Sequence, residues 1–416
     1  MNNFKEYANS FQAVSNLKLD GVRRLAEKVG NPQKKLKFIH VAGTNGKGSV
    51  CAFLQSILTM AGIKTGKFIS PNMLDVCERI SVDGVNISES EMDALMQRLS
   101  EASRSVHEET GKLPTQFEIW TVAAFMYFAE KRCGAVVLET GLGGRMDATN
   151  IIEKPLFSII TRIDMDHMNY LGNTIERIAA EKCGIIKESC PVITLSDERV
   201  ADVIEKAAND MHSRLIIAKK AQSRGFSDMS ELFDYGNIHG IKCGLPGVHQ
   251  IENASLAIEC ALQMGIDEKI IACGIENASN PGRLERISEN PTVIFDGAHN
   301  GSGIDTLACA IRRYFPDRDV SFIFGAMADK DLNPTMQSFK NHGFGKSRFY
   351  TVAVEDNPRA ASQYALADSF AANGFSAQPC KNIGEAYEKA ASENGVTVIC
   401  GSLYLYKDLA DYLKNK

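Results

Sequence analysis

A glycine-rich segment between an apolar strand and an amphipathic helix constrains the fold of this chain more than any other feature. Residues 43–49 read Gly-Thr-Asn-Gly-Lys-Gly-Ser, after the apolar run 36–42 and before a helical apolar pattern over 50–61. Glycines let backbone N–H groups approach phosphate oxygens, the helix N-terminus adds positive potential, and Lys47 supplies a mobile charge. The segment predicts a phosphate site, with Ser49 able to reach a phosphate or a magnesium ion.

The spacing of this segment differs from that of the common P-loop. Position 41 is Val instead of Gly, and Gly48 lies between Lys47 and the hydroxyl residue. A strand-to-helix turn without a ligand is the alternative interpretation, but the lysine, the three glycines and the serine in a βα context favour phosphate binding.

Short apolar runs alternate with helical patterns along the chain, which predicts an α/β fold with mainly parallel sheets and helices on both faces. A capping-box-like Asn173-x-x-Glu176 is expected to begin one helix, and the polar stretch 223–240 receives no assignment. Pro281-Gly282-Arg283 marks a boundary, so we expect an ATP-binding domain over 1–284 and a smaller domain over 285–416. The expected strands are 36–42, 135–140, 156–161, 292–295, 320–324, 348–352 and 396–400, and the clearest helices are 50–61 and 117–130.

Composition narrows the functional classes. A length of 416 residues suits two domains, and a net charge of −5 without a basic block argues against a nucleic-acid partner. The 11 cysteines are scattered without a C-x-x-C pair, which indicates reduced thiols rather than a disulfide or zinc framework. Residues 1–10 lack the apolar core of a signal peptide, and no run approaches the roughly 20 apolar residues of a membrane span, so a cytoplasmic protein with no membrane partner is expected.

Two polar side chains follow strands near the phosphate loop. Glu139 ends the apolar run 135–138 and precedes a glycine-rich loop, and His167 follows the next strand along the chain. Ligands of open α/β sheets bind at the carboxyl ends of strands, so both side chains are expected on neighbouring strand ends, where they could face one metal. Magnesium prefers oxygen ligands, which makes Glu139 the stronger candidate. A structural histidine is the alternative for His167.

Lys182 lies on the apolar stripe of a helix with Ile175, Ile178, Ala179 and Ile186, so partial burial is expected. Its ammonium either reaches the surface along an extended stem or stays desolvated, and a desolvated lysine deprotonates more easily and is open to modification.

A dozen motifs in order from His40 to Leu405 together resemble folylpolyglutamate synthase, bifunctional with dihydrofolate synthase in many bacteria, within the Mur ligase superfamily. They are GTNGKGS, Ser70-Pro71, Glu78-Arg79-Ile80, Phe117-Glu118, ETGLGGRMDATN, DHMNYLG, EKCGI, HQIENA, PGRLE, DGAHN, DKD and GSLYL. The resemblance implies a Mur ligase-like ATP-binding domain and a smaller Rossmann-like glutamate ligase domain.

The resemblance also implies roles for single residues. ATP would be held by both domains, and Ser70, Glu139 and His167 match the magnesium-binding residues of the family. Lys182 falls at the family's carbamylated lysine, and Lys47, Lys182 and His299 are the expected catalytic residues. His299 and Ser402 match motifs of the domain that takes the incoming glutamate. The implied ATP-binding residues are Gly46, Lys47, Gly48, Ser49, Asn253, Arg283 and Asp296, and the implied folate-binding residues are Thr115, Gln116, Phe117, Glu118, Met146, Asp147 and Ala148.

Two departures from the family pattern concern loops near these residues. Asn72 stands where family members commonly have histidine after Ser-Pro, and Arg162-Ile163-Asp164 is more charged than usual. The first puts the folate-side loop in doubt.

The activity implied is an ATP- and Mg²⁺-dependent ligation of L-glutamate to a folate carboxylate through an acyl phosphate, by a monomer acting on small molecules. Whether dihydropteroate is also a substrate stays open. A Mur-type ligase acting on a UDP-linked peptidoglycan precursor and a P-loop ATPase or kinase without ligation are the rival interpretations.

Overall fold

The computed structural model describes residues 18–416, and the chain separates into two compact units. The first contains most of the chain up to Ser279, and the second contains Asn280–Lys416 with two short segments, Phe226–Glu231 and Leu245–His249. The sequence placed the boundary a few residues later, after residue 284, and gave no sign of the two short segments. The expectation for residues 1–10 lies outside the described part.

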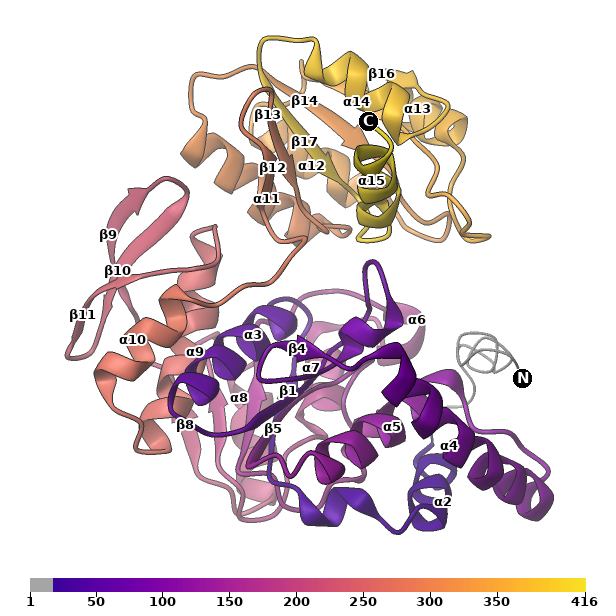
Figure 1. Ribbon diagram of the computed structural model, residues 1–416. Helices are drawn as coiled ribbons and strands as arrows, with labels where there is room; N and C mark the ends of the chain where they lie inside the picture. The colour runs from indigo at the N-terminus through magenta and orange to yellow at the C-terminus, as the bar shows by residue number, and fades with distance from the viewer. Residues whose placement is uncertain (1–17) are drawn as a thin grey trace. The chain divides into compact units, whose positions relative to one another are not determined.

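An eight-stranded sheet organises the first unit (Figure 1). Its strands follow the order β4-β3-β2-β5-β1-β6-β7-β8. The six strands β2, β5, β1, β6, β7 and β8 pair in parallel. Strand β3 pairs antiparallel with β2, and β4 pairs antiparallel with β3. The strands are β1 (Phe38–Ala42), β2 (Thr65–Phe68), β3 (Ile80–Val82), β4 (Val85–Asn86), β5 (Ala135–Glu139), β6 (Phe157–Ile160), β7 (Val192–Thr194) and β8 (Leu215–Ile217).

The helices of the first unit cover both faces of this sheet, as the alternating pattern predicted. They are α2 (Asp20–Lys28), α3 (Lys47–Met60), α4 (Glu89–Thr110), α5 (Gln116–Glu130), α6 (Met168–Leu171), α7 (Ile175–Cys183), α8 (Ala201–Asp210), α9 (His249–Gln263) and α10 (Glu268–Glu276). Short 3-10 helices span Pro32–Lys35, Val76–Arg79 and Ala148–Ile151. None of the described helices has both the length and the apolar character needed to cross a bilayer.

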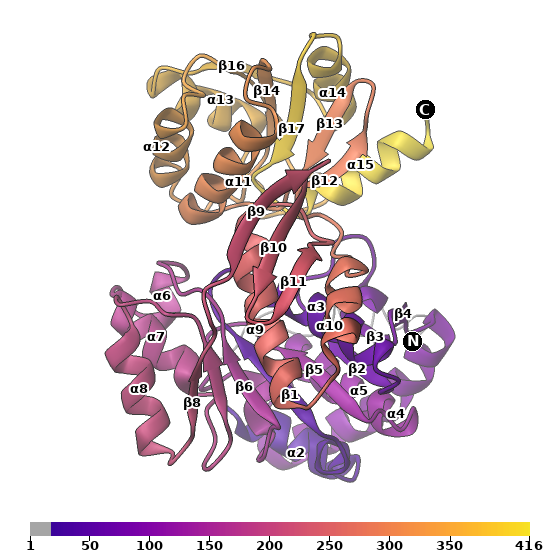
Figure 2. The same ribbon diagram turned by 90° about the vertical axis from the view of Figure 1, so that its left-hand side faces the viewer.

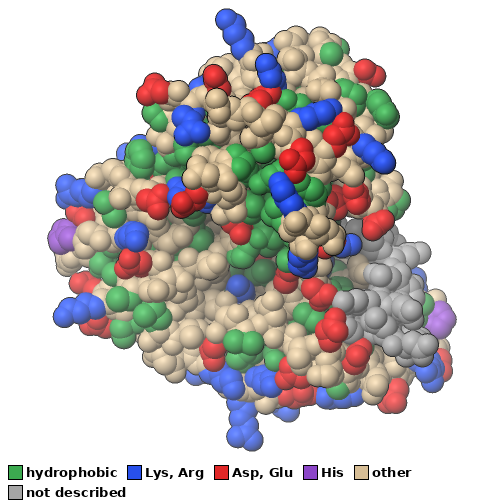
Figure 3. All heavy atoms as spheres, turned by 45° about the horizontal axis from the view of Figure 1, so that its top comes forward, with side chains coloured by type: hydrophobic (Ala, Val, Ile, Leu, Met, Phe, Trp, Pro, Cys, Tyr) green, Lys and Arg blue, Asp and Glu red, His purple; other side chains and the backbone are tan. Residues whose placement is uncertain are grey.

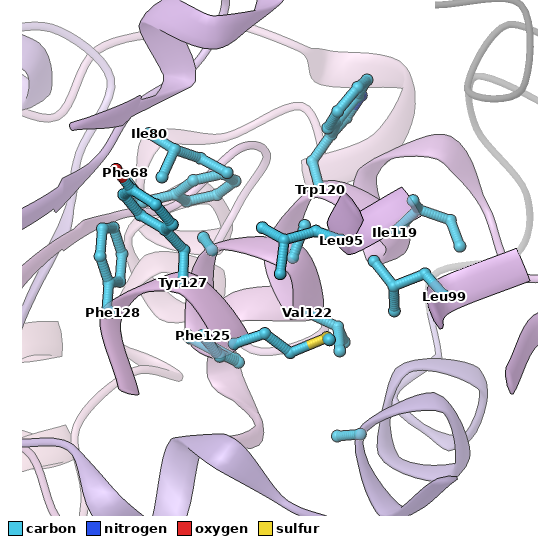
Figure 4. Close-up of a cluster of buried hydrophobic side chains, with 14 of the residues drawn as sticks. Phe68, Ile80, Leu95, Leu99, Ile119, Trp120, Val122, Phe125, Tyr127 and Phe128 are labelled. Atoms are coloured by element: carbon cyan, nitrogen blue, oxygen red, sulfur yellow. The ribbon is translucent and has the colours of Figure 1, made fainter. Parts of the chain in front are cut away.

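Helix α5 is apolar on all sides because it is buried between the sheet and two other helices. Its residues 119–128 are buried, and they share one core with side chains of α2, α4 and Val136 and Leu138 of β5. Figure 4 shows several of these α5 side chains beside Leu95 and Leu99 of α4. Burial of this many large side chains is the main source of stability for this face. Thr115 and Glu118 close the start of the helix by a reciprocal capping box.

The polar stretch that the sequence left unassigned is a three-stranded sheet. Strands β9 (Gln222–Ser227), β10 (Ser230–Tyr235) and β11 (Ile238–Lys242) follow the order β11-β10-β9 (Figure 2). Its alternation is hard to read because every side chain of β9 is at least partly exposed. The expected capping box at Asn173 is wrong: Thr174 caps α7 by accepting a hydrogen bond from the Arg177 N–H, and an arginine at that position cannot complete the box.

The second unit is a six-stranded sheet with the order β12-β13-β17-β14-β15-β16, parallel except for β12. Its strands are β12 (Glu285–Ser288), β13 (Thr292–Phe295), β14 (Val320–Phe324), β15 (Arg348–Thr351), β16 (Ser376–Pro379) and β17 (Val396–Cys400). Its helices are α11 (Gly301–Tyr314), α12 (Asn333–Asn341), α13 (Gln363–Ala372), α14 (Ile383–Ala391) and α15 (Leu405–Lys414). All four strands predicted in this part of the chain are confirmed.

All eleven cysteines are free, as the absence of paired spacing indicated. On the face drawn in Figure 3, basic and acidic side chains are interspersed, which agrees with the modest net charge.

Helix α3, which carries the phosphate loop, packs closely against α10. A Cβ added at Gly274 of α10 would lie 2.6 Å from the Ile57 Cα, so only glycine allows this approach. We predict that Gly274→Ala destabilises the first unit by about 1–3 kcal/mol through overpacking, although alanine favours a helix. Thermal unfolding followed by circular dichroism should show a lower melting temperature. The control is Gly345→Ala, where the added Cβ meets open space; a melting temperature raised by Gly274→Ala would contradict the prediction.

Candidate active site

The phosphate loop is fastened to the segment that follows β6. The backbone N–H groups of Thr44 and Asn45 donate to the Arg162 carbonyl at 2.8 and 3.3 Å, and the Thr44 hydroxyl donates to the Asp164 carbonyl at 3.0 Å. The Thr161 hydroxyl donates to the Asn45 carbonyl at 2.8 Å. These bonds fix the start of the loop before any ligand arrives.

Two glycines of the loop allow close neighbours. A Cβ at Gly43 would lie 1.7 Å from the Thr161 hydroxyl, and one at Gly46 would lie 2.3 Å from the Asn253 Oδ1. Gly46 also has a φ of 91°, a conformation that favours glycine. Asn253, on α9, is therefore beside the loop, as its expected role in ATP binding requires.

Two lysines converge on the carbonyl of Gly43. Lys47 Nζ donates to it at 3.0 Å and to the Thr44 carbonyl at 3.2 Å, while Lys182 Nζ donates to it at 2.7 Å. Lys182 is 4% exposed, so the predicted burial is confirmed and its ammonium stays inside. Burial first, and then the charge of Lys47, lower the pKa of Lys182 to about 7.

Glu139 lies at the end of β5 with a side chain that is 4% exposed. Its carboxylate accepts a hydrogen bond from the backbone N–H of Ser70 at 3.3 Å. Ser70 follows β2, the strand that pairs with β5, so the sheet brings two of the three expected metal-site residues together. Nearby, the Asn72 Oδ1 accepts a hydrogen bond from Arg79 Nε at 2.8 Å, which anchors the loop with the unusual residue.

His167 occupies the start of α6 with a φ of 49°, and its ring lies 3.7 Å from the Asp166 carboxylate. The sequence placed Glu139 and His167 on neighbouring strand ends, whereas β5 and β6 flank β1 on opposite sides. The His167 side chain is 46% exposed. Within residues 18–416, the structure forms no cluster of three or more His, Cys, Asp and Glu side chains suited to a metal ion.

The first expected folate-binding segment packs on the glycine-rich loop that carries the second. A Cβ at Gly141 would lie 2.5 Å from the Phe117 ring, so the start of α5 packs directly on the glycine-rich loop. Met146 is 42% exposed on that loop, and Ala148 is buried. Thr115 and Glu118 bond to each other at the helix start, with the Thr115 N–H donating to the Glu118 carboxylate at 2.6 Å. Gln116 begins the helix beside them.

Asp147 shapes the same loop from inside. One oxygen of its buried carboxylate accepts from the N–H groups of Gly141 and Leu142, at 2.9 and 2.8 Å. The other accepts from the Thr149 hydroxyl at 2.5 Å, and that hydroxyl also contacts the His40 Nε2 at 2.8 Å. The Thr149 hydroxyl has a single proton and donates it to Asp147. His40 Nε2 must therefore be protonated, so that it donates to the Thr149 oxygen. Burial raises the pKa of Asp147 and lowers the pKa of His40 to about 3.

The predicted residues of the second unit gather around Gly297. Asp296 is buried and accepts from the N–H groups of Leu284 and Ala298, at 2.8 and 2.7 Å. Burial raises the pKa of Asp296, and the charge of Arg283 opposes the rise. His299 Nδ1 lies 3.0 Å from the Gly297 carbonyl, and a Cβ at Gly297 would meet both Arg283 and Leu403. Ser402, next to Leu403, is 4% exposed.

Comparison with known proteins bears on what this arrangement is for. The Mur ligase middle domain matches residues 41–261, and the Mur ligase glutamate ligase domain matches residues 282–403. The dihydrofolate synthase/folylpolyglutamate synthase of Bacillus subtilis is 36% identical over 414 residues, covering 95% of each chain. The chain belongs to the dihydrofolate synthase/folylpolyglutamate synthase family of Mur ligases.

Other family members agree. The Escherichia coli dihydrofolate synthase/folylpolyglutamate synthase is 30% identical over 95% of this chain and 91% of its own. Folylpolyglutamate synthase of Mycobacterium tuberculosis, solved with ADP and AMPPCP, superposes with a TM-score of 0.89 at 26% identity, covering 98% of this chain and 97% of its own. Escherichia coli FolC, solved with DHPP and ADP, gives a TM-score of 0.87 at 27% identity, covering 99% of this chain and 97% of that one.

Sequence reasoning missed several residues that build the site. Arg199 donates to the Asp164 carboxylate at 3.1 Å and to the Ile163 carbonyl at 3.0 Å, which holds the segment that fastens the phosphate loop. Thr149 donates a hydrogen bond to Asp147, and His40 of β1 contacts the Thr149 hydroxyl. Arg199 lies in no recognisable local motif. The unusual Asp164 carboxylate was the one sequence signal that a basic side chain would pair with this segment.

Thr149 connects two buried polar groups, so its hydroxyl should matter for stability. We predict that Thr149→Val destabilises the first unit by about 2 kcal/mol or more, because the His40 N–H loses its acceptor and Asp147 loses a donor. Urea unfolding should show the loss. Thr121→Val is the matched control, since Thr121 is equally buried and its hydroxyl donates only to the Phe117 carbonyl within α5; equal effects of the two substitutions would contradict the prediction.

Proposed function

We propose that this protein uses ATP to join L-glutamate to the terminal carboxylate of a folate. The observation that carries the proposal is a phosphate loop with Lys47, in the same sheet as β5, which ends at Glu139. The chain also matches a folate ligase over nearly its full length. A terminal carboxylate oxygen attacks the γ-phosphorus of ATP, the bond to the bridging oxygen breaks, ADP leaves and an acyl phosphate forms. The α-amine of glutamate then attacks the acyl carbon, an amide forms, and phosphate leaves with the electrons of the broken C–O bond.

The residues of the first unit fit this chemistry. Gly46, Lys47, Gly48 and Ser49 would hold the ATP phosphates, and the Lys47 charge stabilises negative charge on the phosphoryl group in flight. Asn253 would contact the nucleotide beside Gly46. The segments 115–118 and 146–148, joined through Phe117 and Gly141, would receive the folate.

The residues of the second unit have proposed roles of their own. Arg283 and Asp296 would contact ATP, and His299 and Ser402 would receive glutamate. The Asp296 carboxylate is fixed by two backbone N–H groups, so its orientation is set within this unit.

A magnesium ion fits the donors at the end of β5. The buried Glu139 carboxylate and the adjacent Ser70 hydroxyl supply oxygen, the ligand that Mg²⁺ prefers, and His167 is the third residue proposed for the site. When bound, the ion would supply positive charge against the phosphates. Glu139 and Ser70 would hold it, and Lys47 would orient the transferred group.

Dihydropteroate is a second candidate substrate, since several relatives have names that combine dihydrofolate synthase with folylpolyglutamate synthase. A Mur-type ligase acting on a peptidoglycan precursor has less support, because the full-length relatives are folate enzymes.

Turnover with defined substrates tests the function. Purified protein given ATP, Mg²⁺, tetrahydrofolate monoglutamate and glutamate should release ADP only when both acceptor and amine are present, and mass spectrometry should find a product longer by one glutamate. We predict that Lys47→Ala lowers kcat by at least about a hundredfold, because the phosphoryl group loses its charge partner. ADP release without the amine would favour an ATPase, and near-normal turnover by Lys47→Ala would refute the role of Lys47. Dihydropteroate and a UDP-linked precursor serve as alternative acceptors.

We also propose that Lys182 is carbamylated. Only a neutral amine captures CO₂, and with a pKa of about 7 the Lys182 amine is mostly neutral above that pH and mostly protonated below it. We predict that intact mass under native conditions with bicarbonate shows one added CO₂ at pH 8 and less at pH 6. Lys187→Ala controls for the other half-buried lysine of this region. Absence of the adduct at pH 8, or its persistence in Lys182→Ala, would contradict the proposal.

A further inference from the structure

Lys67 is a partly buried lysine on the same face of the sheet as the phosphate-loop helix, and none of the roles above uses it. In β2 it lies between Gly66 and Phe68, whose positions face α5: a Cβ at Gly66 would touch the Phe128 ring, and Phe68 is part of the core that α5 builds. Because side chains alternate along a strand, Lys67 points to the opposite face. Helix α3 covers that face.

Two contacts place α3 over Lys67. Lys67 lies directly opposite Ser81 of β3, and the Ser81 hydroxyl accepts a hydrogen bond from Gln55 of α3 at 3.0 Å. One turn earlier on α3 lies Cys51, which is completely buried. The Lys67 stem thus passes beneath the helix that begins at the phosphate loop.

Glu139 shares this face with Lys67. In β5, Val136 and Leu138 belong to the α5 core, so Val137 and Glu139 point to the α3 side. Lys67 pairs with Val137 in the parallel register, which makes Glu139, two residues further along β5, its diagonal neighbour on the same face. A lysine side chain is long enough to bring its ammonium toward the carboxylate.

The Lys67 ammonium has no hydrogen bond or ion pair among residues 18–416 that would hold it elsewhere. Burial lowers the pKa of Lys67, while the nearby Cys51 and Glu139 raise it. The alternative is that the stem only fills space under α3 and the charge is incidental. A methionine would fill the same space without the free-energy cost of burying an ammonium group. The presence of a charged side chain therefore indicates an electrostatic role.

We propose that Lys67 is a fixed positive charge of the phosphate site in addition to Lys47. Its charge replaces part of the charge of the metal, so the protein keeps affinity for the nucleotide when magnesium is absent. The inference rests on the proposed function, since it takes the phosphates to lie by the loop and the metal to lie by Glu139. A positive charge near Glu139 attracts metal-free ADP, which carries more negative charge than its magnesium complex. The same charge repels the cation. Lys67 therefore narrows the difference in affinity between free ADP and Mg·ADP.

Calorimetry with ADP, once in EDTA and once in saturating Mg²⁺, tests the inference. Lys67→Met keeps the length of the stem and removes the charge. We predict that it weakens binding of metal-free ADP about tenfold and binding of Mg·ADP less than threefold. Lys67→Arg should stay close to the unmodified protein in both conditions. Lys64→Met, at an exposed lysine just before β2, removes the same charge from the surface and should change neither constant.

Each outcome of this experiment has one meaning. Equal weakening of both constants by Lys67→Met would show that the side chain only supports the fold, and no change in either would show that its charge does not reach the phosphates; both overturn the inference. Lys67→Gln serves as a second neutral variant if the methionine variant melts at a lower temperature. Unmodified protein that binds no ADP in either condition would instead contradict the proposed function.

Discussion

The site depends on the hydrogen bonds that fasten the phosphate loop to the chain after β6. Thr44 and Asn45 are adjacent to the glycines that must remain free of side chains, and both donate their N–H groups to Arg162. A glycine-rich loop without such restraint would lose much conformational entropy when a phosphate binds. In this protein the loop already loses that entropy on folding, because Thr44 bonds to Asp164 and Arg199 holds Asp164 in place. The unusual charges of this segment thus support the loop instead of disturbing it.

The second constraint is the crowding of positive charge at the start of α3. Lys47 and Lys182 donate to one carbonyl, and the desolvation of Lys182 makes its protonated form costly. Losing a proton or adding a carboxylate both relieve the repulsion between the two ammonium groups. The burial of Lys182 and its proximity to Lys47 therefore both favour a change in its charge, either by loss of a proton or by the proposed carbamylation.

Much of the fold was readable from the sequence, and particular residues explain where this ended. The central strands and four of the five parallel strands of the second unit were predictable, because their apolar runs are short, continuous and bounded by glycine or polar residues. The phosphate loop was predictable from its glycines and lysine between a strand and a helix. The burial of Lys182 was predictable from the helix stripe. The hairpin of β9 and β10 was not, since the side chains of β9 are all at least partly exposed and β10 is mostly buried without a strict alternation. The cap of α7 was missed because two adjacent residues, Asn173 and Thr174, are both good caps.

The candidate site was predictable residue by residue, but its connections were not. Asp147 is the clearest case: the sequence alone gives it a place in a motif, whereas the structure gives it four hydrogen bonds from Gly141, Leu142 and Thr149 that use both of its oxygens. Those bonds hold the loop against Phe117 whether or not a substrate is present. The neighbouring Met146 side chain is 42% exposed, whereas the Asp147 carboxylate is buried and fully engaged in these hydrogen bonds. Adjacent positions in one motif can thus have different surroundings: Asp147 shapes the loop from inside, whereas Met146 is exposed on it, and the sequence alone does not tell them apart.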